Sequence, residues 1–156
     1  MADKEVPYTR MQACQRFLET VTHSMNLGLE MVEVHEDRAL VRMPWQEKLV
    51  GNPDTGVIHG GAVFALMDQA GGLANACVLY PNFEMTPTID MRVDHLRAPE
   101  SGETVTCDAR CYRVSQHVLF VRMTVSGEHH PDELLATGLA TYMRMKMPKR
   151  GGRKNG

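Results

Sequence analysis

The chain has 156 residues, of which 43% are hydrophobic and 23% charged, as is typical of one soluble domain that holds its core without disulfides or metal. Its 17 basic and 19 acidic residues give a formal charge of −2, which argues against a nucleic-acid-binding surface. Because five basic residues lie in the last eleven positions, the chain through Met145 has 12 basic and 19 acidic residues, a charge of −7.

The cysteines and the apolar stretches argue against a zinc-binding, disulfide-bonded, secreted or membrane-spanning protein. No Cys-x-x-Cys pair occurs among the four cysteines, so neither a zinc knuckle nor a disulfide is expected. These cysteines are Cys14, Cys77, Cys107 and Cys111. Residues 1–10 lack the apolar core of a signal peptide, and the most apolar stretch, 57–80, is interrupted by His59, Asp68 and Gln69. We therefore expect a cytoplasmic protein whose partners include neither a membrane nor a nucleic acid.

The first third of the chain changes from a helical to a strand-like pattern. Apolar residues recur at three- and four-residue spacing from Thr9 to Asn26, which predicts one helix ended by Gly28. Residues 29–43 alternate between apolar and polar, with a break near Glu36 and Asp37, which predicts two strands joined by a turn. Residues 52–56 read as a loop.

The central segment, residues 59–79, is long enough for about five helical turns and is apolar on all sides, so it must be enclosed. Four strand-like segments follow, at residues 86–97, 103–115, 117–127 and 134–146. Turns at residues 100–102, 115–117 and 127–132 predict antiparallel pairing. The predicted fold is α+β, an antiparallel sheet wrapped around a long central helix. The predicted divisions are a helical segment at 1–28, a domain at 29–147 and a disordered basic tail at 148–156.

Asp68 is the residue most out of place in the predicted central helix. A carboxylate among enclosed apolar residues costs several kcal/mol unless it is paired or faces a cavity. A structural role, capping a loop or pairing with an arginine, is one explanation. A nucleophile or general base in a cleft is the other.

The tripeptide His59-Gly60-Gly61 stands where the loop becomes this helix. Glycines allow a ligand close to the backbone, and the free N–H groups of a first helical turn favour a developing oxyanion. Gly61 and Asp68 are seven residues apart, hence roughly 10 Å along one helix. If both act on one carbonyl, Asp68 of one subunit must meet the Gly60-Gly61 helix start of another, which predicts a dimer.

The run from His59 to Asp68, preceded by Asn52 and followed by a small-residue helix and four strands, resembles the hotdog-fold acyl-CoA thioesterases of the PaaI-like group. The resemblance covers residues 25–146. It implies the hotdog fold, a homodimer that assembles to a homotetramer, no cofactor, and hydrolysis of a fatty or aromatic acyl-CoA to free acid and CoA.

The resemblance also implies roles for individual residues. Asp68 would be the nucleophile or general base, and the backbone N–H of Gly60 would bind the thioester oxygen. His59 would orient the helix start. Asn52 would hold the water or the thioester, and Thr88 would position the water.

Substrate binding is expected at Gly61 and at two arginines, Arg92 and Arg97, which could meet the phosphates of coenzyme A. A pair between Arg92 and Asp90 or Asp94 is the structural alternative. No metal site is expected at His129-His130, because adjacent side chains point apart and no carboxylate cluster is evident in the sequence.

Two other functions compete with the thioesterase. One is a hotdog dehydratase or hydratase, which needs a catalytic His paired with an acid in a different motif. The other is a non-catalytic acyl-CoA-binding hotdog protein.

Overall fold

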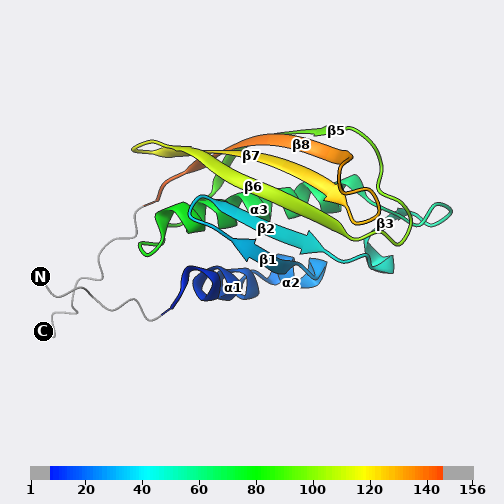
Figure 1. Cartoon of the computed structure of the whole chain (residues 1–156), viewed down its shortest axis with the longest axis horizontal. Helices are drawn as coiled ribbons and strands as arrows, with labels where there is room; N and C mark the ends of the chain where they lie inside the picture. The colour runs from blue at the N-terminus through cyan, green and yellow to red at the C-terminus, as the bar shows by residue number, and fades with distance from the viewer. Residues whose placement is uncertain (1–7, 146–156) are drawn as a thin grey trace, which may run out of the picture.

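The computed structural model describes residues 8–145, within which the chain forms helices on one side of a curved sheet (Figure 1). The elements in chain order are α1 (Arg10–Thr20), α2 (Thr22–Leu27), β1 (Glu30–Val34), β2 (Arg38–Met43), the 3-10 helix η1 (Glu47–Leu49), β3 (Val50–Asn52), β4 (Val57–Ile58), α3 (Gly60–Leu79), β5 (Thr88–His95), β6 (Val105–Val114), β7 (Val118–Gly127) and β8 (Leu134–Met143). The tail predicted at residues 148–156 lies outside this range.

Six strands form one antiparallel sheet in the order β1-β2-β6-β7-β8-β5. Alternate side chains of β6 and β7, among them Val105, Cys107, Leu119 and Val121, are buried and face the side of the sheet on which α3 lies. The predicted antiparallel sheet around one long helix is therefore confirmed.

The turn predicted at residues 100–102 does not join paired strands. β5 pairs with β8 at the edge of the sheet, whereas β6 pairs with β2. The connection between β5 and β6 thus leaves the edge of the sheet and returns to its middle. Local turn residues could not reveal this, because the pairing of β2 with β6 joins segments about 70 residues apart, such as Arg38 and Arg110.

The helix predicted from Thr9 to Asn26 is two helices, broken at Val21, whose backbone is extended at φ −90° and ψ 102°. Residues 20–22 are consecutive β-branched residues, which are weak helix formers, and the Thr20 hydroxyl bonds back to the Phe17 carbonyl. In one unbroken helix Leu27 would point about 180° away from Leu18. The break turns Leu27 inward, so that both leucines are buried.

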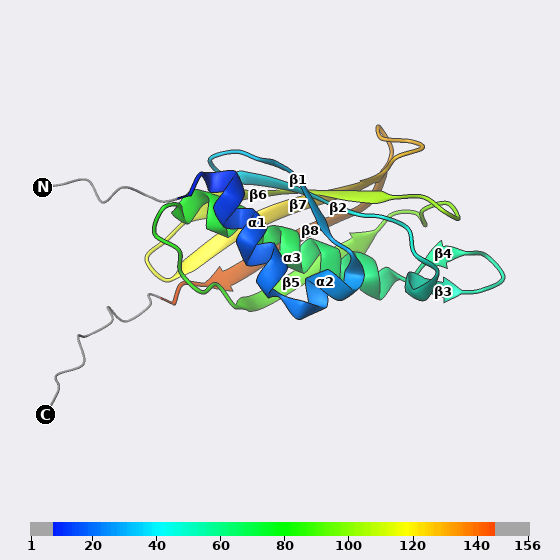
Figure 2. The same ribbon diagram turned by 90° about the horizontal axis from the view of Figure 1, so that it is seen from below.

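A short hairpin, β3-β4, flanks the predicted loop and was missed by the alternation pattern because β4 has only two residues. Its turn is tied down at two points. Trp45 Nε1 donates to the Gly56 carbonyl over 2.9 Å, and Gly56, at φ +66°, lies against Ser101. The hairpin precedes the start of α3 (Figure 2).

Helix α3 is enclosed by the sheet on one side and partly covered by α1 and α2 on the other (Figure 2). It is long and apolar enough to cross a membrane by composition, but 61% of its most apolar window is buried inside the protein, as in a core helix. One stripe of α3 stays open at four-residue spacing, consisting of Gly60, Phe64, Asp68 and Gly72, and it ends at buried Ala76. Along this open stripe the exposure falls from 42% at Phe64 to 9% at Ala76.

All four cysteines are buried and unpaired, yet two of them meet in the fold. Cys14 of α1 and Cys77 of α3 have their Sγ atoms 3.7 Å apart. This contact fixes α1 against the C-terminal half of α3.

Candidate active site

The Asp68 carboxylate lies on the open stripe and is held by Thr88, at the start of β5. Thr88 Oγ1 donates to Asp68 Oδ1 over 2.6 Å. The register of β5 shifts between Thr88 and Asp90, so Thr88 turns toward α3 although Met91 and Val93 also face the core. The structure thus brings together two of the residues singled out in the sequence, twenty positions apart.

Tyr142 of β8 supports the helix beneath Asp68. Its side chain is 1% exposed, and its hydroxyl donates to the Asp68 carbonyl over 3.1 Å. A Cβ atom at Gly71 would collide with this hydroxyl, so Gly71 is what lets the phenol approach the helix. Burial, with a contribution from the Asp68 charge, raises the pKa of Tyr142, which keeps the phenol neutral and able to donate.

The other half of the predicted site is the start of α3. His59 is the N-cap, and its Nδ1 accepts a hydrogen bond from the Gly61 N–H over 2.9 Å. Gly51 of β3 packs so closely on the imidazole that a Cβ atom there would lie 2.9 Å from His59 Cδ2. The hairpin therefore holds His59 in its capping position.

This cap distinguishes the two glycines. The Gly61 N–H is used by His59, and the N–H groups of Ala62 and Val63 bond to the His59 carbonyl. Within the described part of the chain, the Gly60 N–H has no hydrogen-bond acceptor. Gly60 thus offers a free donor at the positive end of a 20-residue helix, which suits an oxyanion better than Gly61 does.

His95, at the end of β5, lies beside Gly60 and was not singled out in the sequence. A Cβ atom at Gly60 would be 3.5 Å from His95 Cε1. Both residues line a groove of about 320 Å³ that also includes Val63, Leu96 and Arg97. We call this the helix-start groove.

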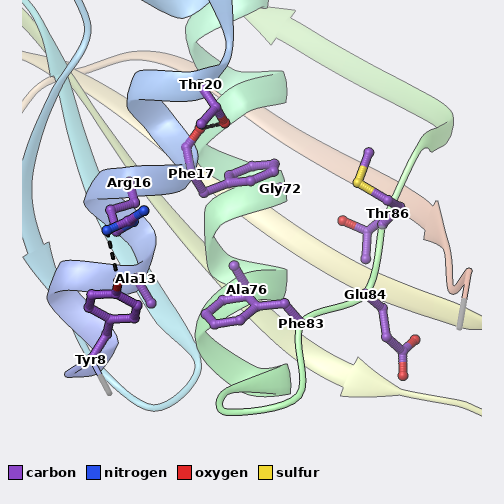
Figure 3. Close-up of a pocket in the computed structure, with 11 residues that line it drawn as sticks. Tyr8, Ala13, Arg16, Phe17, Thr20, Gly72, Ala76, Phe83, Glu84 and Thr86 are labelled. Carbon is purple, nitrogen blue, oxygen red and sulfur yellow. Dashed lines mark hydrogen bonds between the residues drawn. The ribbon is translucent and has the colours of Figure 1, made fainter. Parts of the chain in front are cut away.

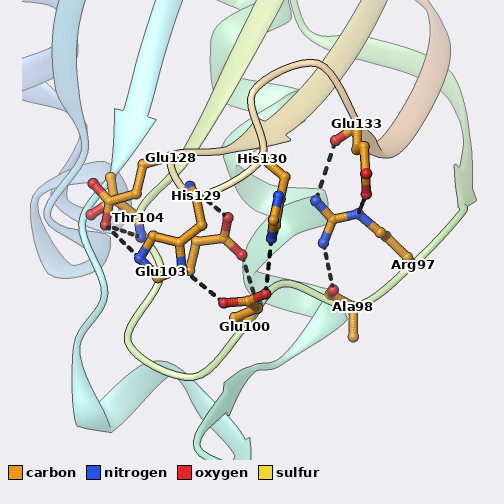
Figure 4. Close-up of polar contacts among 9 residues, drawn as sticks. All are labelled: Arg97, Ala98, Glu100, Glu103, Thr104, Glu128, His129, His130 and Glu133. Carbon is orange, nitrogen blue, oxygen red and sulfur yellow. Dashed lines mark hydrogen bonds and ion pairs between the residues drawn. The ribbon is translucent and has the colours of Figure 1, made fainter.

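Arg97 is fixed at the wall of this groove by the chain around it (Figure 4). Its Nη1 donates to the Ala98 carbonyl and its Nη2 to the Glu133 carbonyl, and Nε lies 3.5 Å from a Glu133 carboxylate oxygen. The Nε atom is buried and makes an ion pair without hydrogen-bond geometry.

The loop that carries Arg97 is anchored to the β7-β8 connection (Figure 4). The Glu100 carboxylate contacts His129 Nδ1 at 3.0 Å and His130 Nε2 at 3.2 Å, and these contacts lower the pKa of Glu100. Fully buried Glu103 accepts from the backbone N–H groups of Glu100 and His129. Across residues 8–145, no group of three or more metal-ligating side chains is found, here or elsewhere.

Arg92 and Asn52 make no hydrogen bond or ion pair with Asp68 within residues 8–145. Arg92 is on the face of β5 opposite Met91 and Val93, and its guanidinium pairs with Asp94 at 3.1 Å. Asn52 ends β3, where its Oδ1 accepts from the Asp54 N–H over 3.0 Å and shapes the hairpin turn. Their roles in substrate binding and catalysis stay predictions.

The sequence reasoning missed His95 and Tyr142 for the same reason. Each reaches α3 only through the pairing of β5 with β8, which places His95 opposite Ala136 and Thr88 opposite Tyr142. A lone histidine and a lone tyrosine in strand-like segments carry no local signal of that arrangement.

Comparison with known proteins agrees with this architecture. The family model of the thioesterase superfamily matches residues 55–133. The medium/long-chain acyl-CoA thioesterase YigI of Escherichia coli is 28% identical over 144 residues, which cover 83% of this chain and 89% of YigI.

Among solved structures, a protein from Pseudomonas aeruginosa is 36% identical, with a TM-score of 0.79 over 88% of this chain and 100% of that one. The PaaI protein of E. coli is 19% identical and has a TM-score of 0.76 over 87% of this chain and 93% of its own, which shows a shared fold. The chain therefore belongs to the thioesterase superfamily of thioester hydrolases and has the hotdog fold of its PaaI-like members.

Proposed function

We propose that this protein hydrolyses acyl-CoA thioesters to a free acid and CoA, with Asp68 as the reacting carboxylate. The observation that carries the proposal is the hydrogen bond from Thr88 to Asp68 on the open stripe of α3. It holds a carboxylate, the only charged side chain of α3, at a fixed position. The name of YigI, an acyl-CoA thioesterase, supports the same substrate class.

Thioester hydrolysis needs few catalytic groups. The thioester carbon is attacked, the C–S bond breaks, and the CoA thiolate leaves without strong acid catalysis because a thiol has a pKa near 8.5. Asp68 either takes a proton from the attacking water or attacks the carbon itself and forms an anhydride, which water then opens at the Asp68 carbon. A single turnover in isotopically labelled water separates these paths, since the anhydride path delivers an unlabelled oxygen from Asp68 to the first acid released.

The oxyanion is assigned to the Gly60 N–H of the partner subunit. Within one subunit Gly60 and Asp68 are roughly 12 Å apart along the axis of α3, too far to meet one carbonyl. A donor at the oxyanion position is worth about 10²- to 10³-fold in kcat, so the site needs a second helix start.

The position of β5 supports such a shared site. Along the described chain β5 pairs only with β8, so its other edge is open to a second copy. Two β5 strands paired about a two-fold axis run antiparallel, so the start of one strand lies opposite the end of the other. Thr88, at the start of β5, is hydrogen-bonded to Asp68, and His95, at the end of β5, lies beside Gly60. A symmetric β5-β5 dimer therefore places Asp68 of one copy near Gly60 of the other.

Coenzyme A is assigned to the helix-start groove. Its phosphates need cations, and the described chain is acidic overall, whereas Arg97 lines this groove. Asn52, at the neighbouring hairpin, would hold the thioester or the water in the assembled dimer.

We further propose that the dimer assembles to a tetramer in the cytoplasm. Sedimentation of the purified protein measures the assembly.

The test is release of free thiol from a panel of acyl-CoAs. Asp68→Asn should lower kcat by at least about 10²-fold, while Asp132→Asn, an exposed carboxylate in the β7-β8 connection, should be unaffected. Tight binding of acyl-CoA without thiol release would instead identify a non-catalytic acyl-CoA-binding protein. Equal turnover by Asp68→Asn would remove Asp68 from its role.

A further inference from the structure

We propose that the acyl group binds in an apolar pocket between α1, α3 and the segment before β5, so that the N-terminal helix sets the acyl-chain length. This inference rests on the proposed function, because it takes the thioester to lie at Asp68. The pocket has a volume of about 360 Å³, within the range of small-molecule sites.

The pocket lies further along α3 than Asp68, at Gly72 and Ala76, which Figure 3 shows with the other lining residues. Its floor is Gly72 and Ala76 of α3, four and eight residues after Asp68. Thr86, two residues before Thr88, lines the same end as Gly72, so the pocket reaches to within about one helical turn, roughly 6 Å, of the carboxylate. It is therefore next to the reacting carbonyl in the proposed complex.

The walls are mostly apolar and come from segments on both sides of α3. The Phe17 ring of α1 lies near Gly72, and the Phe83 ring lies near Ala76 (Figure 3). Phe83 is braced by Tyr80, with ring centroids 6.1 Å apart. At the end away from Asp68, Arg16 donates to the Tyr8 hydroxyl over 2.9 Å.

Two anchors hold the walls in place. On one side, the contact between buried Cys14 and Cys77 fixes α1 to α3. On the other, Arg144, just after β8, forms a two-point ion pair with Glu84, at 2.6 and 3.0 Å, and both side chains are largely buried. Contacts within the fold thus hold both walls of this partly open pocket in place.

The chemistry of the substrate decides which arm enters here. The CoA arm is anionic and suits the groove of Arg97 on the partner subunit, whereas the acyl arm is apolar. From Asp68 to Ala76 the helix rises by about 12 Å. An extended chain with bonds of about 1.5 Å advances roughly 1.25 Å per carbon, so the pocket holds an acyl group of about eight to ten carbons.

Gly72 offers the sharpest test, because a Cβ atom there meets nothing within 4 Å, so a side chain enters the pocket without displacing the fold. In the wild type, kcat/KM should rise about fourfold per added methylene up to eight to ten carbons and then level off. Gly72→Leu should end this rise at about four or five carbons. Decanoyl-CoA would then lose on the order of 10²- to 10³-fold, while butanoyl-CoA stays within about twofold.

Truncation of α1 supplies the converse change and a matched control. Arg16→Ala, which removes a side chain at the end of the pocket away from Asp68, should move the limit to longer chains, whereas Glu19→Ala, on the exposed side of the same helix, should keep the wild-type profile. An unchanged chain-length profile in a folded Gly72→Leu protein overturns the inference. So does an equal loss for butanoyl- and decanoyl-CoA.

Affinity for non-hydrolysable S-alkyl-CoA thioethers, measured by calorimetry, separates this inference from the proposed function. If the wild type releases no thiol but the gain in affinity with alkyl length is truncated by Gly72→Leu, the pocket assignment stands and the enzyme proposal fails. If thiol is released but Gly72→Leu leaves the alkyl-length dependence unchanged, the pocket assignment fails alone.

Discussion

The hydrogen bond between Thr88 and Asp68 can be removed without changing the shape of either element. Thr88→Val replaces the hydroxyl by a methyl group and leaves Asp68 Oδ1 without the donor that lies 2.6 Å away. A hydrogen bond to a charged group contributes about 1.5–3 kcal/mol, and because Thr88 is exposed the lower end applies. At 1.36 kcal/mol per factor of ten, kcat should fall roughly 10- to 30-fold.

The assay is thiol release from one acyl-CoA at saturating concentration, with thermal unfolding measured in parallel. The unfolding free energy should fall by about 1.5 kcal/mol at most, a few degrees in melting temperature, so the variant stays folded in the assay. Thr88→Ser keeps the donor and should retain most of the activity. If Thr88→Val turned over as fast as the wild type, the hydroxyl would not position the reacting carboxylate.

Three further substitutions have outcomes fixed by the geometry. Gly60→Pro removes the free N–H at the first helical position, where proline fits after an extended His59 (φ −63°, ψ 137°), so kcat should fall about 10²- to 10³-fold with circular dichroism unchanged. Gly71→Ala should destabilise the fold by about 1–3 kcal/mol in urea unfolding, because its methyl group collides with the buried Tyr142 hydroxyl; unchanged stability would contradict that packing. Asn75 is fully buried, and neither polar atom of its side-chain amide has a hydrogen-bond partner in residues 8–145. Asn75→Leu should therefore raise the unfolding free energy by about 1–3 kcal/mol, and a loss of stability would contradict this.

Periodicity located the main elements, because each long segment buries one consistent face. The predicted segments 117–127 and 134–146 lie within three residues of β7 and β8 at each end, and α3 begins at Gly60 as the His59-Gly60-Gly61 turn indicates. Patterns failed where tertiary packing overrides local preference. At Val21 the chain breaks to bury Leu27, and β5 leaves its neighbour in sequence to pair with β8.

The main residues of the site could be predicted from the sequence, but the hydrogen bonds and contacts between them could not. Asp68 and Gly60 stand out in the sequence because a carboxylate and a glycine are unusual where they occur. The use of the Gly61 N–H by His59, and the resulting free donor at Gly60, depend on side-chain geometry that no spacing encodes. His95 lies beside Gly60 only because β5 pairs with β8.

In the proposed dimer one reaction uses Asp68 of one subunit and Gly60 of the other, and mixing two inactive variants tests this shared site most directly. The Asp68→Asn and Gly60→Pro proteins should each be nearly inactive, and after subunit exchange half of the dimers should contain one of each. In a shared site, each mixed dimer has one complete site of two, so about a quarter of the wild-type activity should appear. If both residues acted within one subunit, no mixed dimer would hold a complete site, and activity that stayed at the level of the separate variants would contradict a shared site.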